Sequence, residues 1–235
     1  MMSQKTLIHS KKSNVLCFSS VKPLNFKEKY FKKNIKRIYS SLKLSPKKTV
    51  YAKQVHGKRI IAVKDAKVKL LQKADGFITN CRNILLVIFT ADCLPVFIYD
   101  KNGRCAGIIH CGWRSTYKEI IKNAVSRMKK RYNVKPGDLK FVFGPFIGKC
   151  CYEVSGGLAL KFRKKFGKKG IINRCGKSCL DLAEINKRQI LSLKVPARNI
   201  SIKKAYCTSC KDKLFYSYRR DGKGTGRMLN GIVIV

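Results

Sequence analysis

The longest apolar segment of the chain is ILLVIFTADCLPVFIYD, which occupies residues 84–100. A run this rich in Ile, Leu, Val and Phe is typical of strand buried inside a sheet, so the fold must be built around a covered sheet. Asp92 and Pro95 interrupt the run, and it is too short to span a bilayer, so we expect no membrane segment. The turn KNG follows and leads into RCAGIIH, which we predict to be a strand that ends at His110.

Strand and helix patterns alternate along residues 49–235 without a break in composition. The runs TVYAKQVHG and RIIAVKD, divided by a Gly-Lys turn, predict a hairpin, and LFYSYRR and MLNGIVIV predict short strands near the C-terminus. Helices are expected after two capping boxes, at Thr116 with Glu119 and at Asp181 with Glu184. This alternation favours a single α/β domain.

Residues 1–48 form a basic segment with weak patterning, which we assign to the same domain. Apolar residues recur at helical spacing between Tyr30 and Leu42, so one amphipathic helix is expected there. Pro46 would follow the end of that helix.

Positive charge dominates the composition, with 53 Lys and Arg against 12 Asp and Glu and a formal net charge of +41. Such an excess attracts nucleic acid and other polyanions over long range. The lysines recur in every segment, however, whereas a dedicated nucleic-acid binder more often carries a basic patch with interleaved aromatic residues. We therefore favour drift of the surface composition and expect nucleic acid to bind only non-specifically.

The chain has 11 cysteines, which bear on its compartment. Its first residues, MMSQKTLIHSKKSN, lack the apolar core of a secretion signal, so we expect a cytoplasmic protein with reduced thiols. Cys207 and Cys210, together with Cys175 and Cys179, resemble a four-thiolate zinc set. Free cysteines also pack readily as small apolar residues, and we favour that interpretation.

Three residues that bind soft or borderline metals, His56, Cys93 and His110, each lie at or just past the end of an apolar strand. All three side chains would converge if these strand ends share one rim of a sheet. Two imidazoles and one thiolate suit zinc and leave a fourth position open, as in catalytic zinc sites, and copper is compatible with the same set. Alternatively, Cys93 is a small core residue and the histidines make ordinary hydrogen bonds, and spacing alone does not separate the two interpretations.

A helix start follows directly after His110, in CGWRSTYKE. Free backbone N–H groups there favour an anion, and Arg114 could clamp a phosphate or carboxylate, although an Arg beside a Trp is also common in surface packing. Asp92, next to Cys93, would orient a ligand histidine or a metal-bound water, or else cap a turn. A metal-activated water beside an anion site points to hydrolysis or phosphorolysis.

The motifs QVHG, TADCLPV, HCGWR, FGPFIGKCCYEV, LDL and CTSC…FYSYRR…TGR occur in this order over about residues 50–235. Together they resemble the YfiH/YlmD family, which was first labelled a polyphenol oxidase or laccase-like group. The resemblance implies a single layered α/β fold with mixed β-sheets flanked by helices, a metal-dependent catalytic domain over residues 49–235, and metal ligands at His56, Cys93 and His110. It also implies zinc-dependent purine nucleoside phosphorylase and adenosine deaminase activities.

On this resemblance the ligands are a purine nucleoside and phosphate. Adenosine, inosine and S-methyl-5'-thioadenosine would be split into base and sugar 1-phosphate, and adenosine would also be deaminated. Glu153 and Arg219 lie in family motifs and are expected to serve in acid/base chemistry and anion binding. Two departures concern substrate handling: SNVLCFSSV lacks the N-terminal arginine that lines the family's site, and HCGWRS stands for the usual HAGWRG.

Three further functions stay open from the sequence: amide hydrolysis that edits peptidoglycan precursors, copper-dependent oxidation of polyphenols, and non-specific binding of nucleic acid. No second copper cluster is visible in the sequence, which disfavours a laccase. We expect a monomer.

Overall fold

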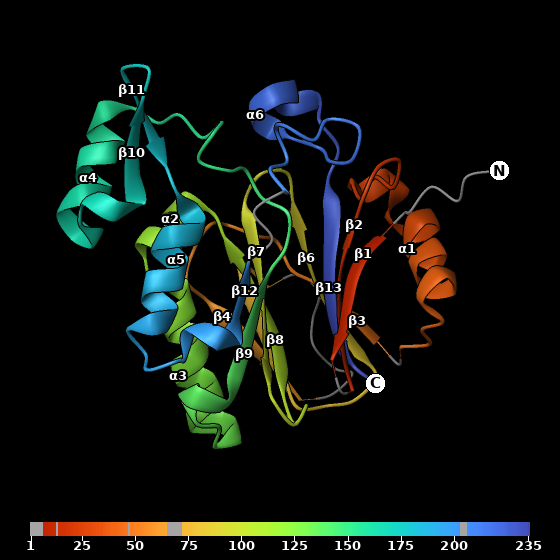
Figure 1. Ribbon diagram of the computed structural model, residues 1–235. Coiled ribbons are helices and arrows are strands. Elements are labelled where there is room, and N and C mark those ends of the chain that lie inside the picture. Colours follow the sequence, from red (N-terminus) through yellow and green to blue (C-terminus); the bar gives the residue numbers. More distant parts are fainter. Residues whose placement is uncertain (1–6, 13, 47, 65–71, 203–205) are drawn as a thin grey trace.

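The computed structural model describes residues 7–12, 14–46, 48–64, 72–202 and 206–235 (Figure 1). Two β-sheets pack face to face, and helices cover the outer face of each sheet, so the molecule has four layers. The predicted α/β fold with mixed sheets flanked by helices is confirmed.

The first sheet has five strands in the order β1-β2-β13-β6-β3. All neighbours are antiparallel except β3 and β6, which are parallel. The pairing of β2 with β13 joins the N-terminal and C-terminal parts of the chain inside this sheet. The strands, in sheet order, are β1 Leu7–Lys12, β2 Val15–Ser20, β13 Met228–Ile234, β6 Ile84–Thr90 and β3 Lys48–Val50.

The second sheet has six strands in the order β12-β9-β7-β8-β5-β4. It is also mixed, because β12 pairs with β9 and β4 with β5 in parallel while the other neighbours are antiparallel. The strands, in sheet order, are β12 Ile200–Ile202, β9 Leu139–Phe143, β7 Leu94–Asp100, β8 Ala106–Cys111, β5 Gly76–Thr79 and β4 Ile60–Val63.

The helices form the outer layers. The five-stranded sheet is covered by α1 Glu28–Leu42, and the six-stranded sheet by α2 Trp113–Tyr117, α3 Ile120–Tyr132 and α5 Leu182–Leu191. The remaining elements are α4 Gly156–Phe166, the hairpin β10 Ile171–Arg174 and β11 Lys177–Leu180, α6 Tyr218–Asp221, and the 3-10 turns η1 Pro136–Asp138, η2 Lys168–Gly170, η3 Ala197–Asn199 and η4 Gly222–Gly224. Among the helices of the described ranges, none is long and apolar enough to cross a membrane.

Strand β6 shows how the layers are held together. Its side chains alternate, because successive residues of a strand point to opposite faces of the sheet. Leu85 and Val87 pack with the buried residues of α1, whereas Leu86 and Ile88 pack between the two sheets. Both faces of the strand are therefore buried in separate apolar layers, which explains its unbroken apolar sequence.

Two predictions about the strands within residues 49–100 are wrong. Residues 84–100 are two strands rather than one, because β6 and β7 belong to different sheets and residues 91–93 cross from the first sheet to the second. Both strands are apolar on both faces, so the sequence pattern continues across the crossing. The hairpin expected in residues 49–65 is also absent, since β3 joins the five-stranded sheet and β4 the six-stranded one. The loop between them carries His56.

The predicted capping box of Thr116 and Glu119 is wrong as well. Helix α2 begins earlier, and the N–H of Gly112 in front of it donates to Ser115 Oγ at 3.1 Å. Glu119 has a φ of 56° and separates α2 from α3. The apolar face expected after it is nevertheless buried, as α3.

Of three other predicted elements, two are confirmed and one is wrong. The amphipathic helix of the N-terminal segment is confirmed as α1. Asp181 caps α5 by accepting the N–H of Glu184 at 2.9 Å, as expected. The segment LFYSYRR is not a strand, because Ser217 caps α6 inside it by accepting the N–H of Arg220.

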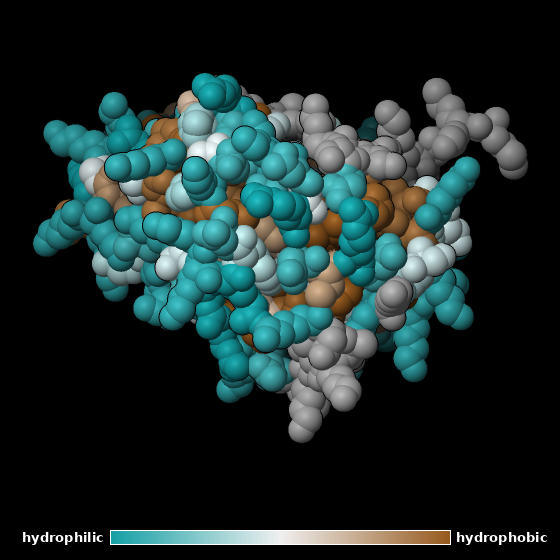
Figure 2. Space-filling model, turned by 90° about the horizontal axis from the view of Figure 1, so that it is seen from below, coloured by the Kyte–Doolittle hydropathy of each residue, from teal (hydrophilic) through white to brown (hydrophobic). Residues whose placement is uncertain are grey.

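Hydrophilic side chains are spread widely over the face of the molecule shown in Figure 2, with small apolar areas between them. They do not gather there into a single stripe. This distribution agrees with lysines that recur in every segment of the sequence.

Candidate active site

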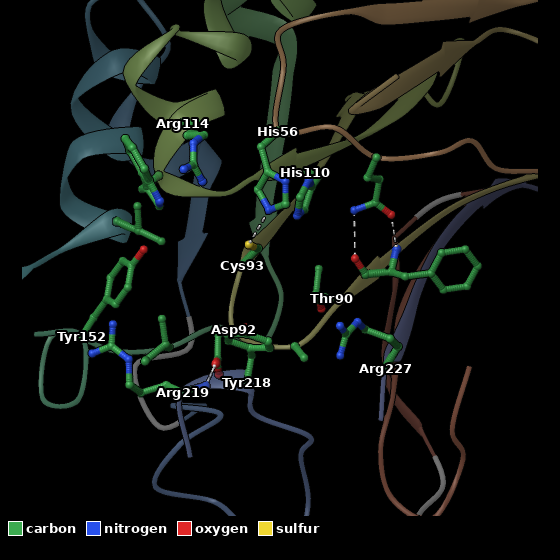
Figure 3. A pocket seen from close by; sticks show the side chains of 16 residues that line it. His56, Thr90, Asp92, Cys93, His110, Arg114, Tyr152, Tyr218, Arg219 and Arg227 are labelled. Carbon is green, nitrogen blue, oxygen red and sulfur yellow. Dashed lines mark hydrogen bonds between the residues drawn. The ribbon is translucent and has the colours of Figure 1, made fainter. Parts of the chain in front are cut away.

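The three predicted metal ligands form one cluster at the rim where the chain crosses between the sheets (Figure 3). Cys93 lies in that crossing, His110 lies on β8 opposite Pro95, and His56 lies in the loop between β3 and β4. Cys93 Sγ is 3.7 Å from His56 Nε2, and one ligand atom from each residue lies within 4.8 Å of the others. The two imidazole rings meet edge to face with their centroids 4.8 Å apart.

Gly112 allows this cluster to sit against the start of α2. A Cβ at this position would lie 2.7 Å from His56 Cδ2 and 3.1 Å from Cys93 Sγ, so a larger residue would displace the ligands. His56 itself has a φ of 54°, and Asp92, next to Cys93, has a φ of 96°. Non-glycine residues held in such conformations occur preferentially at active sites and ligand clamps.

Asp75, directly before β5, is a buried carboxylate that positions both histidines. Its Oδ1 lies 2.9 Å from His110 Nδ1 and accepts the backbone N–H of His56 at 2.9 Å. Its Oδ2 accepts the backbone N–H groups of Gly57 at 2.7 Å and Val55 at 3.2 Å. Because an ionised carboxylate only accepts hydrogen bonds, Nδ1 of His110 carries a proton and Nε2 is the nitrogen available to a metal.

The electrostatics of the cluster favour a thiolate. Burial raises the pKa of Cys93, but the charges and hydrogen bonds of His110 and His56 outweigh it and lower the pKa to about 6. Burial lowers the pKa of His110, whereas Cys93 and Asp75 outweigh it and raise the pKa to about 9. A metal cation would therefore take the place of a proton on His110 and meet a thiolate that is already ionised at neutral pH.

The donor set fits zinc, because two imidazole nitrogens and one thiolate match catalytic sites with three protein ligands. Copper is compatible with the same donors. One side of the cluster opens on a cavity of about 680 Å³. That volume is in the range of small-molecule binding sites.

Aromatic rings line the cavity beside the cluster. Phe89 is fixed by Gln54, whose side-chain amide accepts the Phe89 N–H at 2.7 Å and donates to the Phe89 carbonyl at 2.9 Å. Both hydrogen bonds are drawn in Figure 3. The aromatic lining residues are Phe89, Trp113, Tyr152 and Tyr218.

Three arginines, Arg114, Arg219 and Arg227, also line the cavity. The Arg114 guanidinium lies 4.3 Å from the centre of the Trp113 ring, and that of Arg219 lies 5.2 Å from the centre of the Tyr152 ring. In the part of the chain that the structure describes, none of the three forms an ion pair with a carboxylate. The three guanidinium groups therefore contribute positive charge to this side of the cavity.

A family model described as "Multi-copper polyphenol oxidoreductase laccase" matches residues 26–235. The chain belongs to this family. Purine nucleoside phosphorylase of Clostridium acetobutylicum is 34% identical over 192 residues, which cover 78% of this chain and 75% of that relative. Adenosine deaminase RL5, from an unknown prokaryotic organism, is 29% identical over 195 residues, which cover 78% of this chain and 74% of that relative.

Among solved structures, the hypothetical protein YfiH of Bacillus licheniformis superposes with a TM-score of 0.90 at 28% identity. The match covers 100% of this chain and 98% of that one. The predicted resemblance to the YfiH/YlmD family is thereby confirmed.

Asp92 and Glu153, the two carboxylates expected to serve in catalysis, have other partners here. Asp92 Oδ1 accepts the hydroxyl of Thr208 at 2.6 Å, and its Oδ2 accepts the backbone N–H of Arg219 at 2.6 Å. Asp92 lines the cavity, but the expected orientation of a ligand histidine falls to Asp75. Glu153 lies outside the lining and forms an exposed ion pair with Lys177 at 3.0 Å.

Sequence reasoning did not assign Asp75 or Arg227 to the site. Asp75 lies in ADGF, and Arg227 closes the TGR motif by which the family is recognised. The family motifs therefore contained a signal for Arg227 but none for Asp75. Spacing along the chain gave no signal for either residue, because each reaches the site through the pairing of two strands that are far apart in the sequence.

Proposed function

We propose that this family member is a zinc-dependent purine nucleoside enzyme. It would split adenosine, inosine and S-methyl-5'-thioadenosine with phosphate, and would also deaminate adenosine. The observation that carries the proposal is a three-ligand metal cluster that opens on a cavity lined by aromatic rings and three arginines. The relatives named purine nucleoside phosphorylase and adenosine deaminase support it.

The aromatic residues suit a purine. Planar rings such as Trp113 and Tyr152 offer large apolar faces together with a polar N–H or O–H group, so they bury a heterocycle while still making hydrogen bonds. Tyr152 is half-buried beside the cavity, and the partial loss of solvent raises the pKa of its hydroxyl well above the usual range. Its hydroxyl therefore stays protonated at neutral pH and is available as a hydrogen-bond donor.

The arginines suit phosphate. In phosphorolysis a phosphate oxygen forms a bond to C1′ of the ribose while the bond from C1′ to the purine nitrogen breaks, so negative charge moves from phosphate to the departing base. Arg114, Arg219 and Arg227 can hold the phosphate through charge-assisted hydrogen bonds. Asp92 positions Arg219 by accepting its backbone N–H, and so links the anion side of the cavity to the crossing that carries Cys93.

Zinc held by His56, Cys93 and His110 would supply a Lewis acid for the departing base and a means to ionise water for deamination. Asp75 keeps the lone pair of His110 Nε2 free for that ion, because it holds the ring proton on Nδ1.

The test begins with elemental analysis of protein purified without added metal. Nucleosides are then incubated with and without phosphate, and free base and ammonia are measured separately. We expect phosphate-dependent release of base from inosine and phosphate-independent release of ammonia from adenosine. Cys93→Ala should abolish both, whereas Cys105→Ala, at a buried thiol in the core near the β7–β8 turn, should retain them. Full activity of the Cys93→Ala protein without metal would overturn the proposal.

Copper-dependent phenol oxidation is the second candidate, favoured by the His₂Cys donor set and the description of the family. Among the described residues, only one of the two groups able to hold a metal contains histidine. The same metal analysis decides between the candidates. Copper with oxidation of a phenolic substrate, and no release of purine base, would select the oxidase.

A further inference from the structure

Four cysteines meet at a second place, away from the His56–Cys93–His110 cluster. Cys150 and Cys151 lie in the turn that follows β9, and Cys207 and Cys210 lie in the loop that precedes α6. Cys210 Sγ is 3.5 Å from Cys150 Sγ and 3.3 Å from Cys151 Sγ. All four sulfur atoms lie within 4.8 Å of one another.

This spacing matches a tetrahedral metal site better than disulfides. Zinc–sulfur bonds of about 2.3 Å place the sulfurs of a tetrahedron about 3.8 Å apart. The separations from Cys210 Sγ, 3.3 and 3.5 Å, lie slightly below that value, and every other separation in the cluster is at most 4.8 Å. A disulfide would need two of them at about 2.05 Å, and all four cysteines are free.

The backbone alone brings the four sulfurs together. The N–H of Cys151 donates to the Gly148 carbonyl at 3.0 Å, and this turn lets two adjacent side chains face the same partner. Phe146 pairs with Cys207 in a parallel bridge, which aligns the two loops. The N–H of Gly148 donates to Cys207 Sγ at 3.2 Å, a hydrogen bond that stabilises a thiolate and orients it as a ligand.

The surroundings also favour an anionic site. Four thiolates around one Zn²⁺ leave a net charge of −2, which a basic environment compensates. Lys149 and Lys211 are sequence neighbours of the cysteines, and Arg174 Nη1 donates to the Cys150 carbonyl at 2.9 Å. These neighbouring cations, in a chain with a formal charge of +41, would offset part of that negative charge.

We propose that Cys150, Cys151, Cys207 and Cys210 form a structural zinc site. Four thiolates complete the coordination of zinc and leave no position for substrate, so the site serves the fold rather than the chemistry. In the sequence, Cys175 and Cys179 resembled partners of Cys207 and Cys210 in a four-thiolate set, although ordinary packing of these thiols was the favoured interpretation. In the structure they lie at the β10–β11 hairpin and are replaced in the set by Cys150 and Cys151.

The zinc would connect two loops that both carry cavity residues. Tyr152 follows Cys151 directly, and Arg219 lies in α6 beyond the second loop. Arg219 Nη1 donates to the Cys151 carbonyl at 3.3 Å, and Thr208, next to Cys207, donates to Asp92. Fixing these loops would therefore hold the ring of Tyr152 and the guanidinium of Arg219 in place.

The test uses full-length protein in which the first cluster is disabled by Cys93→Ala, so that only the second site is counted. We expect one zinc per chain in this variant and none after the further changes Cys150→Ser and Cys210→Ser. Cys175→Ser, at an exposed cysteine outside the cluster, is the matched control and should keep the zinc. The outcome is independent of nucleoside turnover, so it stands or falls separately from the proposed function.

A second measurement covers the case in which the serine variants do not fold. The Cys93→Ala protein is stripped of metal with a chelator, titrated with Co²⁺, and followed by visible absorption. We expect one equivalent to bind with the intense sulfur-to-cobalt bands of tetrahedral thiolate coordination, and a higher unfolding temperature. Absence of zinc from the Cys93→Ala protein together with absence of those bands would overturn the proposal. So would a thiol titration, without reductant, that shows the four cysteines joined in disulfides.

Discussion

Replacing Asp75 by asparagine tests whether one buried carboxylate organises the metal cluster. The two carboxylate oxygens accept four hydrogen bonds, two each, from three consecutive backbone N–H groups and from His110 Nδ1. Asparagine has nearly the same shape but replaces one oxygen by an NH₂ group, which donates. Whichever way the amide turns, two of the four donors lose their acceptor.

The expected magnitude follows from that count. A fully buried donor left without a partner costs about 1–3 kcal/mol, and the three backbone donors here are only partly buried, so the two losses together should lower the free energy of unfolding of the metal-free protein by about 1–3 kcal/mol. Metal affinity should also fall by about 10–100-fold, as is typical when the partner of a ligand histidine is removed. If the NH₂ group faces His110, the ring must accept at Nδ1, which moves its proton to Nε2 and blocks the metal-binding nitrogen.

Urea denaturation of the metal-free protein measures the first quantity, and competition with a chelating dye measures the second. Asp100→Asn is the matched control. Asp100 is also a buried carboxylate, but it lies at the end of β7 away from the metal cluster, where it accepts a hydrogen bond from Arg104 Nε at 2.8 Å. This variant should lose stability and keep its metal affinity. An Asp75→Asn protein that binds zinc as tightly as the wild type would refute the reasoning.

Three further outcomes are expected. Gly112→Ala should weaken metal binding by about 10–100-fold, because the added Cβ would lie 2.7 Å from the His56 ring, and calorimetric zinc titration checks this. Arg227→Gln should raise the KM for phosphate by about 10–100-fold, which corresponds to the loss of one charged hydrogen bond. The KM for inosine should change less. Equal changes in the two KM values would contradict a role of Arg227 in phosphate binding. The pKa of His110 is about 9 and that of Cys93 is about 6, so between pH 6 and 9 His110 is protonated and Cys93 is a thiolate. Zinc binding in this range must displace one proton from His110. The apparent zinc affinity should therefore fall about tenfold for each unit by which the pH decreases. An affinity that does not change between pH 6.5 and 8.5 would exclude the thiolate–imidazolium pair.

The ligands of the cluster were accessible to sequence reasoning as metal-binding residue types next to apolar segments, although only His110 lies on a strand, Cys93 lies in the crossing before β7, and His56 lies in the loop between β3 and β4. Asp75, the carboxylate that supports these ligands, was not accessible in this way. Asp75 meets His110 only because β5 and β8 pair antiparallel, with Gly76 opposite Ile109, and no local spacing announces that register. The crossing at residues 91–93 was not predicted because the local sequence pattern does not change there. The strands on both sides of it are buried on both faces, so their apolar patterns merge into one.

The N-terminal departure from the family pattern can now be placed in the fold. The segment SNVLCFSSV, which lacks the expected arginine, contains β2, and β2 pairs with β13 so that Asn230 lies opposite Ser19. Arg227 directly precedes β13, its carbonyl accepts the N–H of Phe26 at 2.9 Å, and its side chain lines the cavity. The cationic side chain of Arg227, which directly precedes β13, is thus part of the cavity lining. Loss of the N-terminal arginine therefore leaves the cavity with three guanidinium groups, enough to compensate a phosphate dianion.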